Sequence, residues 1–261
     1  MNIFYDKERL GDIDQAISLF DAETFKSPTR STIPLLSWVK HEQLMVTTLL
    51  EELGLPTGCS LYFEYQVKPP KGSGRASHTD LMAMSGAHTL AIEAKWTEPR
   101  YETVGEWLVK TAGKQDDPPA NGNRRNVLDG WLSLLQQYAL RSLKPDDFID
   151  AVYQMVHRAA SACSAGSKPK LAYLIFKPSD DPRTASAQTI RDDLAHLWGL
   201  LGRPSEFPFY LVEIFLTPTA AFNKIAHLPK NEETTSELVK QALLSDRLFN
   251  FARYSIKKIP N

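Results

Sequence analysis

Two acidic residues and a lysine in the first half of the chain are of types that could bind a metal ion if folding brings them together. Asp80 precedes Glu93 by 13 residues, and Lys95 follows Glu93 after one intervening residue. Carboxylates repel each other at close range unless a cation lies between them, and oxygen ligands are those that hard divalent cations prefer. If folding brings Asp80 and Glu93 together, we therefore expect a divalent metal between them.

The local sequence predicts how these residues meet. Two segments of strand-like composition, 78–84 and 88–96, are joined by three small residues, a connection of hairpin length. Gly86 divides the span between Asp80 and Glu93 almost equally, so antiparallel pairing would place the two carboxylates opposite each other. Side chains alternate along a strand, so the lysine two residues further on shares the face of Glu93.

A third acid comes from the segment 35–53, where apolar residues recur at helical spacing between a Ser-Thr cap and a Gly-x-Pro stop. We expect one amphipathic helix here. Glu42 falls inside its apolar stripe, so the helix would direct this carboxylate towards the core, where it needs a partner. Glu64, on the face of its strand that Tyr62 shares, competes for the same role.

The motif and its setting resemble the PD-(D/E)xK, or restriction-endonuclease-like, nuclease superfamily. Members carry an Asp near the start of the second core strand and Glu-x-Lys in the third, within a core of helix, three strands, helix and strand. Thr79-Asp80 and Glu93-Ala94-Lys95 occupy those places here, and Thr79 stands where the family motif has proline.

The resemblance implies a Mg²⁺-dependent nuclease of restriction, defence or repair type, in which Mn²⁺ can replace Mg²⁺. Asp80 and Glu93 would bind the metal with the main-chain carbonyl of Ala94, and the metal would lower the pKa of a water molecule. Glu42, which is similar to the first-helix acid of many members, would complete the metal shell. Lys95 would orient the attacking water or neutralise developing negative charge. The partner would be nucleic acid, with DNA favoured over RNA.

The order of elements predicts an α/β domain with a central mixed sheet flanked by helices. We place the restriction-endonuclease-like core, in αβββαβ order, at about 31–216, and expect a C-terminal helical extension at about 217–261 within one domain of 1–261. The stretch 116–123 predicts an exposed loop. The remaining expected elements are helices at 104–111, 127–143, 145–163, 185–201 and 232–251, and strands at 61–67, 170–176 and 209–216.

The composition excludes several classes of protein. Thirty Lys and Arg against 31 Asp and Glu give a net charge of −1, which argues against a protein that coats nucleic acid through bulk positive charge. Cys59 and Cys163 lie far apart without Cys or His neighbours, so neither a disulfide framework nor a zinc site is indicated. No signal peptide or membrane-spanning run is present, and we expect a cytoplasmic protein without membrane contact.

Two other interpretations stay open. In the first, the same fold lacks the chemistry and serves as a nucleic-acid-binding or protein-interaction module, which the missing motif proline favours. In the second, Glu93 and Lys95 form an ordinary ion pair in an unrelated α/β domain. The residues also leave open endonuclease against exonuclease action, and a homodimer would suit cutting of both strands because a twofold axis relates two sites.

Overall fold

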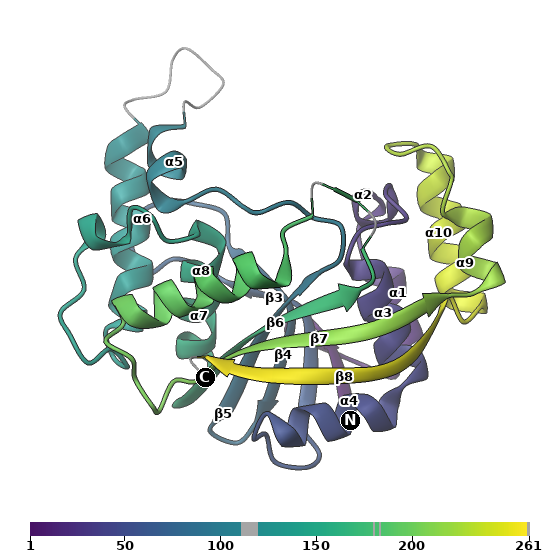
Figure 1. Cartoon of the computed structure of the whole chain (residues 1–261), viewed down its shortest axis with the longest axis horizontal. Helices are drawn as coiled ribbons and strands as arrows, with labels where there is room; N and C mark the ends of the chain where they lie inside the picture. Colours follow the sequence, from purple (N-terminus) through teal and green to yellow (C-terminus); the bar gives the residue numbers. More distant parts are fainter. Residues whose placement is uncertain (111–119, 180, 183, 260–261) are drawn as a thin grey trace.

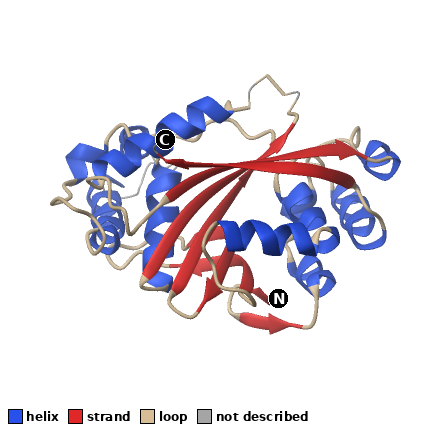
Figure 2. Cartoon of the chain, turned by 60° about the horizontal axis from the view of Figure 1, so that its bottom comes forward, coloured by secondary structure: helices blue, strands red, loops and turns tan. Residues whose placement is uncertain are grey.

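A mixed β-sheet runs through the molecule and carries helices on both faces (Figures 1 and 2). The computed structural model describes residues 1–110, 120–179, 181–182 and 184–259, and within them the sheet has eight strands in the order β2-β1-β3-β4-β5-β6-β7-β8. The predicted α/β class with a central mixed sheet is confirmed.

The strands that position the candidate site are the four in the middle of the sheet. β3, β4 and β5 form an antiparallel meander, and β6 then runs parallel to β5. β7 is parallel to β6, and β1 is parallel to β3. The strands are β1 (Asn2–Tyr5), β2 (Glu8–Leu10), β3 (Ser60–Val67), β4 (Ser77–Ser85), β5 (His88–Lys95), β6 (Lys168–Lys177), β7 (Phe209–Pro218) and β8 (Phe249–Ile259).

The helices divide into two layers, each with its own hydrophobic core. One face of the sheet packs against α1 (Ile13–Leu19), α2 (Ala22–Phe25), α3 (Thr32–His41), α4 (Gln43–Glu52), α9 (Ala220–Ile225) and α10 (Glu233–Ser245). The other packs against α5 (Val104–Val109), α6 (Ala120–Leu135), α7 (Tyr153–Ala165) and α8 (Ala187–Leu200).

Alternation along β5 decides which layer receives the charged residues. Leu90, Ile92 and Ala94 are buried in the core beneath α3 and α4, whereas Ala91 belongs to the core beneath α7. Because successive side chains point to opposite faces, Glu93 and Lys95 share the face of Ala91. The charged residues of the motif therefore lie beneath α7.

The expectation of one helix over 35–53 is wrong, because the segment forms α3 and α4 with a break at Glu42. Glu42 has φ −122° and ψ 45°, outside the helical region. Its N–H bonds to the carbonyl of Trp38, while its own carbonyl accepts from Val46. The apolar periodicity continues across this single residue, so the sequence pattern does not reveal the break.

The expectation of a wholly helical C-terminal extension is also wrong. α9 and α10 are helical, but residues 249–259 form β8, which pairs antiparallel with β7. Phe249 and Phe251 are buried while Asn250 between them is exposed, as a strand packed on one face requires. The end of the described chain is therefore part of the sheet.

Between β5 and β6 the helices begin and end differently from the prediction. Instead of 127–143, α6 spans Ala120–Leu135, and instead of one helix over 145–163 there is a 3₁₀ helix at Pro145–Phe148 followed by α7. Of the predicted loop 116–123, residues 116–119 lie outside the described residues and 120–123 begin α6. Within the described ranges, no helix is both long enough and apolar enough to cross a membrane.

Candidate active site

Asp80 and Glu93 occupy facing positions on neighbouring strands. The β4–β5 ladder pairs Ser85 with His88 at the turn and Leu81 with Ile92 at its far end, so the next positions outward are Asp80 and Glu93. This register confirms the predicted hairpin. Asp80 Oδ2 also accepts a hydrogen bond of 2.8 Å from the main-chain N–H of Ala94, which fixes the carboxylate against β5.

Three donors surround the Glu93 carboxylate, whose side chain is only 3% exposed. Lys95 Nζ lies 2.8 Å and Gln154 Nε2 2.7 Å from Oε1, and Arg158 Nε lies 2.5 Å from Oε2. Burial alone would raise the pKa of Glu93, but the charges of Arg158 and Lys95 outweigh it and hold this pKa below its ordinary value. Glu93 is therefore an ionised carboxylate within a buried ion cluster.

Asp80 experiences the opposite balance. Burial, together with the negative charge of Glu93, raises the pKa of Asp80 well above its ordinary value, although Arg158 and Lys95 act against this rise. The side chain retains some exposure to solvent. Two carboxylates of which one resists ionisation are the arrangement that a bound cation would relieve.

Polar residues flank Asp80 and Glu93 on the neighbouring strands of the sheet. Glu64 of β3 lies beside Asp80, between the printed pairs Phe63–Leu81 and Tyr65–Thr79, and Tyr173 of β6 pairs with Glu93. Glu64 departs from strand geometry with φ 51°, and its Oε2 lies 3.3 Å from His78 Nδ1. Tyr173 Oη is buried without a hydrogen-bond partner in the described part of the chain. The face of the sheet beneath α7 therefore carries a row of polar residues, which we call the polar row: Glu64, Asp80, Glu93 and Tyr173.

Glu42 lies elsewhere. It sits between α3 and α4, which cover the opposite face of the sheet, and its Oε1 is 2.9 Å from Arg247 Nη1. The break in the helix removes the geometry that would direct Glu42 into the apolar stripe. The structure therefore does not bring Glu42 to Asp80 and Glu93, and the acid that the register aligns with Asp80 is Glu64.

Sequence reasoning missed the contribution of α7. Gln154 and Arg158 both reach Glu93, and each residue is at most 8% exposed. Their i, i+4 spacing puts them on one face of α7, whose other buried residues are mostly apolar. An arginine on a buried helical face needs an anionic partner. Arg158 within an apolar helix therefore indicates that an acidic residue packs against α7.

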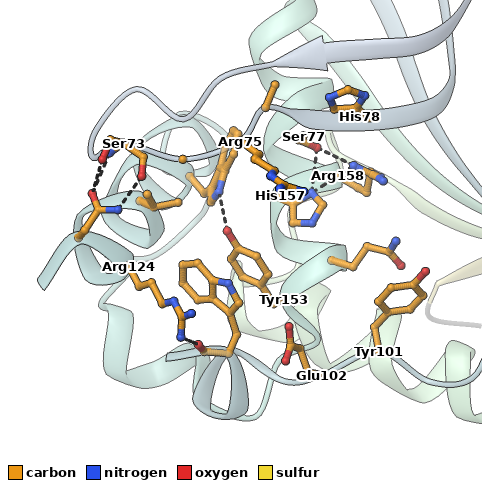
Figure 3. Close-up of a pocket in the computed structure, with 17 residues that line it drawn as sticks. Ser73, Arg75, Ser77, His78, Tyr101, Glu102, Arg124, Tyr153, His157 and Arg158 are labelled. Carbon is orange, nitrogen blue, oxygen red and sulfur yellow. Dashed lines mark hydrogen bonds between the residues drawn. The ribbon is translucent and has the colours of Figure 1, made fainter. Parts of the chain in front are cut away.

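A second polar network joins Arg158 to His157. Arg158 Nη1 donates to Ser77 Oγ at 2.7 Å, and Ser77 Oγ lies 2.8 Å from His157 Nδ1 (Figure 3). Burial, with the charges of Arg158 and Lys95, holds the pKa of His157 well below its ordinary value. Arg158 Nη1 is also 3.3 Å from Nδ1 and can only donate, so Nδ1 accepts and the neutral ring carries its proton on Nε2.

Beside this network lies a cavity of about 530 Å³, drawn in Figure 3. Arg158, Gln154, Ser77 and His157 lie in its wall, so the cavity directly adjoins the groups that hold Glu93. Its other lining residues are Ser73, Gly74, Arg75, Ala76, His78, Tyr101, Glu102, Trp107, Asn123, Arg124, Val127, Trp131 and Tyr153.

A protein-family model, the domain of unknown function DUF6946, matches residues 10–208. The chain belongs to this family. The matched span contains the polar row, α7 and every residue of the cavity wall, and it ends directly before β7. Searches among curated proteins and among solved structures found no match.

The described side chains of this DUF6946 domain that could hold a metal ion are few. In the described ranges, no three His, Cys, Asp or Glu side chains are grouped so that they could hold a metal ion. Mg²⁺ commonly binds through one or two carboxylates and keeps several waters, and the facing carboxylates of Asp80 and Glu93 match that chemistry.

Proposed function

We propose that this DUF6946 domain is a Mg²⁺-dependent nuclease that hydrolyses phosphodiester bonds in DNA. The observation that carries the proposal is the register that sets Asp80 opposite Glu93, with Lys95 Nζ 2.8 Å from the Glu93 carboxylate. The order α3–α4, β3, β4, β5, a helical segment that ends with α7, and β6 supports it, because it resembles the αβββαβ order of the restriction-endonuclease-like core.

The residues would divide the reaction as follows. Asp80, Glu93 and the main-chain carbonyl of Ala94 would hold Mg²⁺, which supplies a water of lowered pKa and neutralises phosphate charge when bound. Lys95 is fixed between the Glu93 carboxylate and the ring of Tyr101, 4.1 Å from the ring centroid, and would orient the water or neutralise the developing charge.

The charges in the cluster bear on how the metal and the substrate bind. The cations of Lys95 and Arg158 pair with the Glu93 carboxylate and act against the rise in the pKa of Asp80. A divalent cation added alone would leave an excess of positive charge, which a phosphodiester would offset. We therefore expect Mg²⁺ to bind more tightly when nucleic acid is present.

A second candidate function is binding of nucleic acid without hydrolysis. It is favoured by the donors already on Glu93, because Lys95, Gln154 and Arg158 engage both carboxylate oxygens. For Glu93 to bind a metal ion, at least one of these three donors would have to share its carboxylate oxygen with the metal or move away from it. In this case Asp80 would be a structural residue that fixes β4 to Ala94.

The two candidates separate in a cleavage assay. Purified protein is incubated with plasmid, linear duplex and single-stranded DNA, and with RNA of the same sequence, in Mg²⁺, Mn²⁺ or EDTA. We expect cleavage that requires the metal and is lost in Asp80→Asn, which keeps an acceptor for Ala94. The control Glu206→Gln removes one carboxylate from an exposed position and should cut like the wild type. Absence of cleavage by the wild type on every substrate, or equal cleavage by Asp80→Asn, refutes the nuclease, and tight metal-independent binding then favours the second candidate.

A further inference from the structure

The cavity beside the carboxylates has the size and the wall chemistry of a ligand site. Its volume of about 530 Å³ lies within the ~300–1,000 Å³ that is usual for small-molecule sites. Residues 73–78 form one wall, and residues 101–102 with side chains of α5, α6 and α7 form the others (Figure 3). The proposed reaction uses residues that do not line this cavity, so the reaction does not account for the presence of the cavity.

Aromatic rings and arginines share this wall. Trp107 and Tyr153 stack with ring centroids 3.8 Å apart and planes inclined by 10°. Arg124 lies 5.7 Å from the Trp107 ring and donates to the main-chain carbonyls of Trp107 and Lys110. Tyr101 is 42% exposed, with Lys95 against its ring. Exposed aromatic surface beside fixed cations is the combination that binds unpaired bases and their phosphates.

Gln154 provides an acceptor in the same wall. The residue is 8% exposed, and its Nε2 is committed to Glu93. Its Oε1 is buried and has no hydrogen-bond partner in the described part of the chain, which is unfavourable for a buried polar atom. The oxygen has almost no exposed surface, so a ligand that donates a hydrogen bond would reach it once the side chains over it move apart.

His157 provides a donor. Its Nδ1 accepts from Ser77, so its Nε2–H is left for a ligand. The edges of nucleobases carry donors and acceptors, and an unpaired base exposes them for recognition. A donor and an acceptor in one aromatic cavity therefore suit a base that is not paired with another strand.

Arg158 ties this cavity to the carboxylates. One guanidinium bonds both Glu93 and Ser77, so only one side chain separates the cavity from the proposed reaction centre. Arg75, which lines the cavity, is exposed and has no charged partner among the residues that the structure describes. A strand whose phosphate lies at Asp80 and Glu93 would thus bring its neighbouring nucleotide into the cavity.

We propose that the cavity binds one unpaired nucleotide of the substrate, with its base among Tyr101, Gln154 and His157 and a phosphate near Arg75. The proposal rests on the proposed function in that the ligand is nucleic acid. It specifies the substrate as a single strand, a frayed end or a flipped nucleotide, rather than an intact duplex held only by its backbone.

Binding without catalysis tests this directly. A fluorescein-labelled 12-nucleotide single strand and the matching blunt duplex are titrated in EDTA and followed by fluorescence anisotropy. We expect the single strand to bind more tightly than the duplex. Tyr101→Leu should weaken single-strand binding about tenfold, as loss of one stacked base implies, and Tyr101→Phe should bind like the wild type.

Two further measurements address the phosphate and the base. Arg75→Gln should lower the slope of log affinity against log salt by about 0.7, whereas Lys230→Gln, which removes an exposed cation near α10, should leave it unchanged. 2′-Deoxyadenosine 5′-monophosphate should displace the labelled strand, and inorganic phosphate at the same concentration should not. Thermal melts of each variant show whether the fold is intact, and Arg75→Gln keeps the test informative if Tyr101→Leu unfolds.

The outcomes separate this inference from the nuclease. Equal or tighter binding of the duplex, or unchanged binding by both Tyr101→Leu and Arg75→Gln, overturns the nucleotide site, and cleavage that depends on Asp80 would still support the nuclease. Single-strand binding that depends on Tyr101, in a protein that cleaves nothing, supports the nucleotide site and refutes the nuclease.

Discussion

Arg158 Nε lies 2.5 Å from Glu93 Oε2, and both side chains are more than nine-tenths buried. The two residues are 65 positions apart in the chain and meet only because α7 packs across β5. Taking both charges out of water is unfavourable, and their mutual attraction offsets this only while both are present. The pair is therefore both a structural contact of the fold and the link between the carboxylates and the cavity.

Removal of Arg158 should destabilise the fold strongly. In Arg158→Met the Glu93 carboxylate keeps Lys95 and Gln154 but loses the ion pair at Oε2, and we expect the free energy of unfolding to fall by about 3–5 kcal/mol. Urea unfolding at pH 7.5 measures this. The exposed control Arg203→Met should change stability by less than about 0.5 kcal/mol. A loss below about 1 kcal/mol for Arg158→Met would show that the pair is not a strong contact.

The neutral His157 should make the fold sensitive to mild acid. Its pKa in the folded protein lies well below the ordinary value, so below about pH 6.5 the unfolded chain takes up a proton that the folded protein does not. Stability therefore falls with decreasing pH, by about 1.4 kcal/mol per pH unit below that point. Between pH 7.5 and 5.5 the wild type should lose about 1 kcal/mol more than His157→Gln does. An equal loss in both proteins contradicts the prediction, and the exposed His196→Gln should behave like the wild type.

Glu64 and Glu42 should differ in their effect on cleavage. Glu64 lies in the row of Asp80, so Glu64→Gln should lower the cleavage rate at limiting Mg²⁺ about tenfold through weaker metal binding. Glu42→Gln breaks only the pair with Arg247 and should leave cleavage unchanged. Initial rates over a Mg²⁺ titration measure both variants. A larger effect of Glu42→Gln would restore the first-helix acid to the site.

Lys95 should matter for the rate rather than for binding. Lys95→Met removes the ammonium that faces Glu93 and should lower the cleavage rate by about 10²–10⁴-fold. Because the carboxylates that would hold Mg²⁺ remain, the affinity for a single strand measured in Ca²⁺ should change much less. A rate within threefold of the wild type would exclude Lys95 from the reaction.

The sequence by itself determined the hairpin and the face that its charged residues share. Alternation along β4 and β5 and a turn at Gly86 are local features, so they specify that Asp80 and Glu93 are paired and that Lys95 lies beside Glu93. The same local signals located β3, β6 and β7. A period of two along a strand needs no knowledge of the rest of the chain.

Only the tertiary structure decided which residues surround the β4–β5 hairpin. Whether Glu42 or Glu64 joins Asp80 depends on a one-residue break between α3 and α4 and on which sheet face those helices cover. The contact of Arg158 with Glu93 depends on the packing of α7 across β5, and the cavity depends on three helices meeting residues 73–78. These arrangements arise from side-chain packing between segments far apart in the chain, and a local pattern of residues carries no information about such distances.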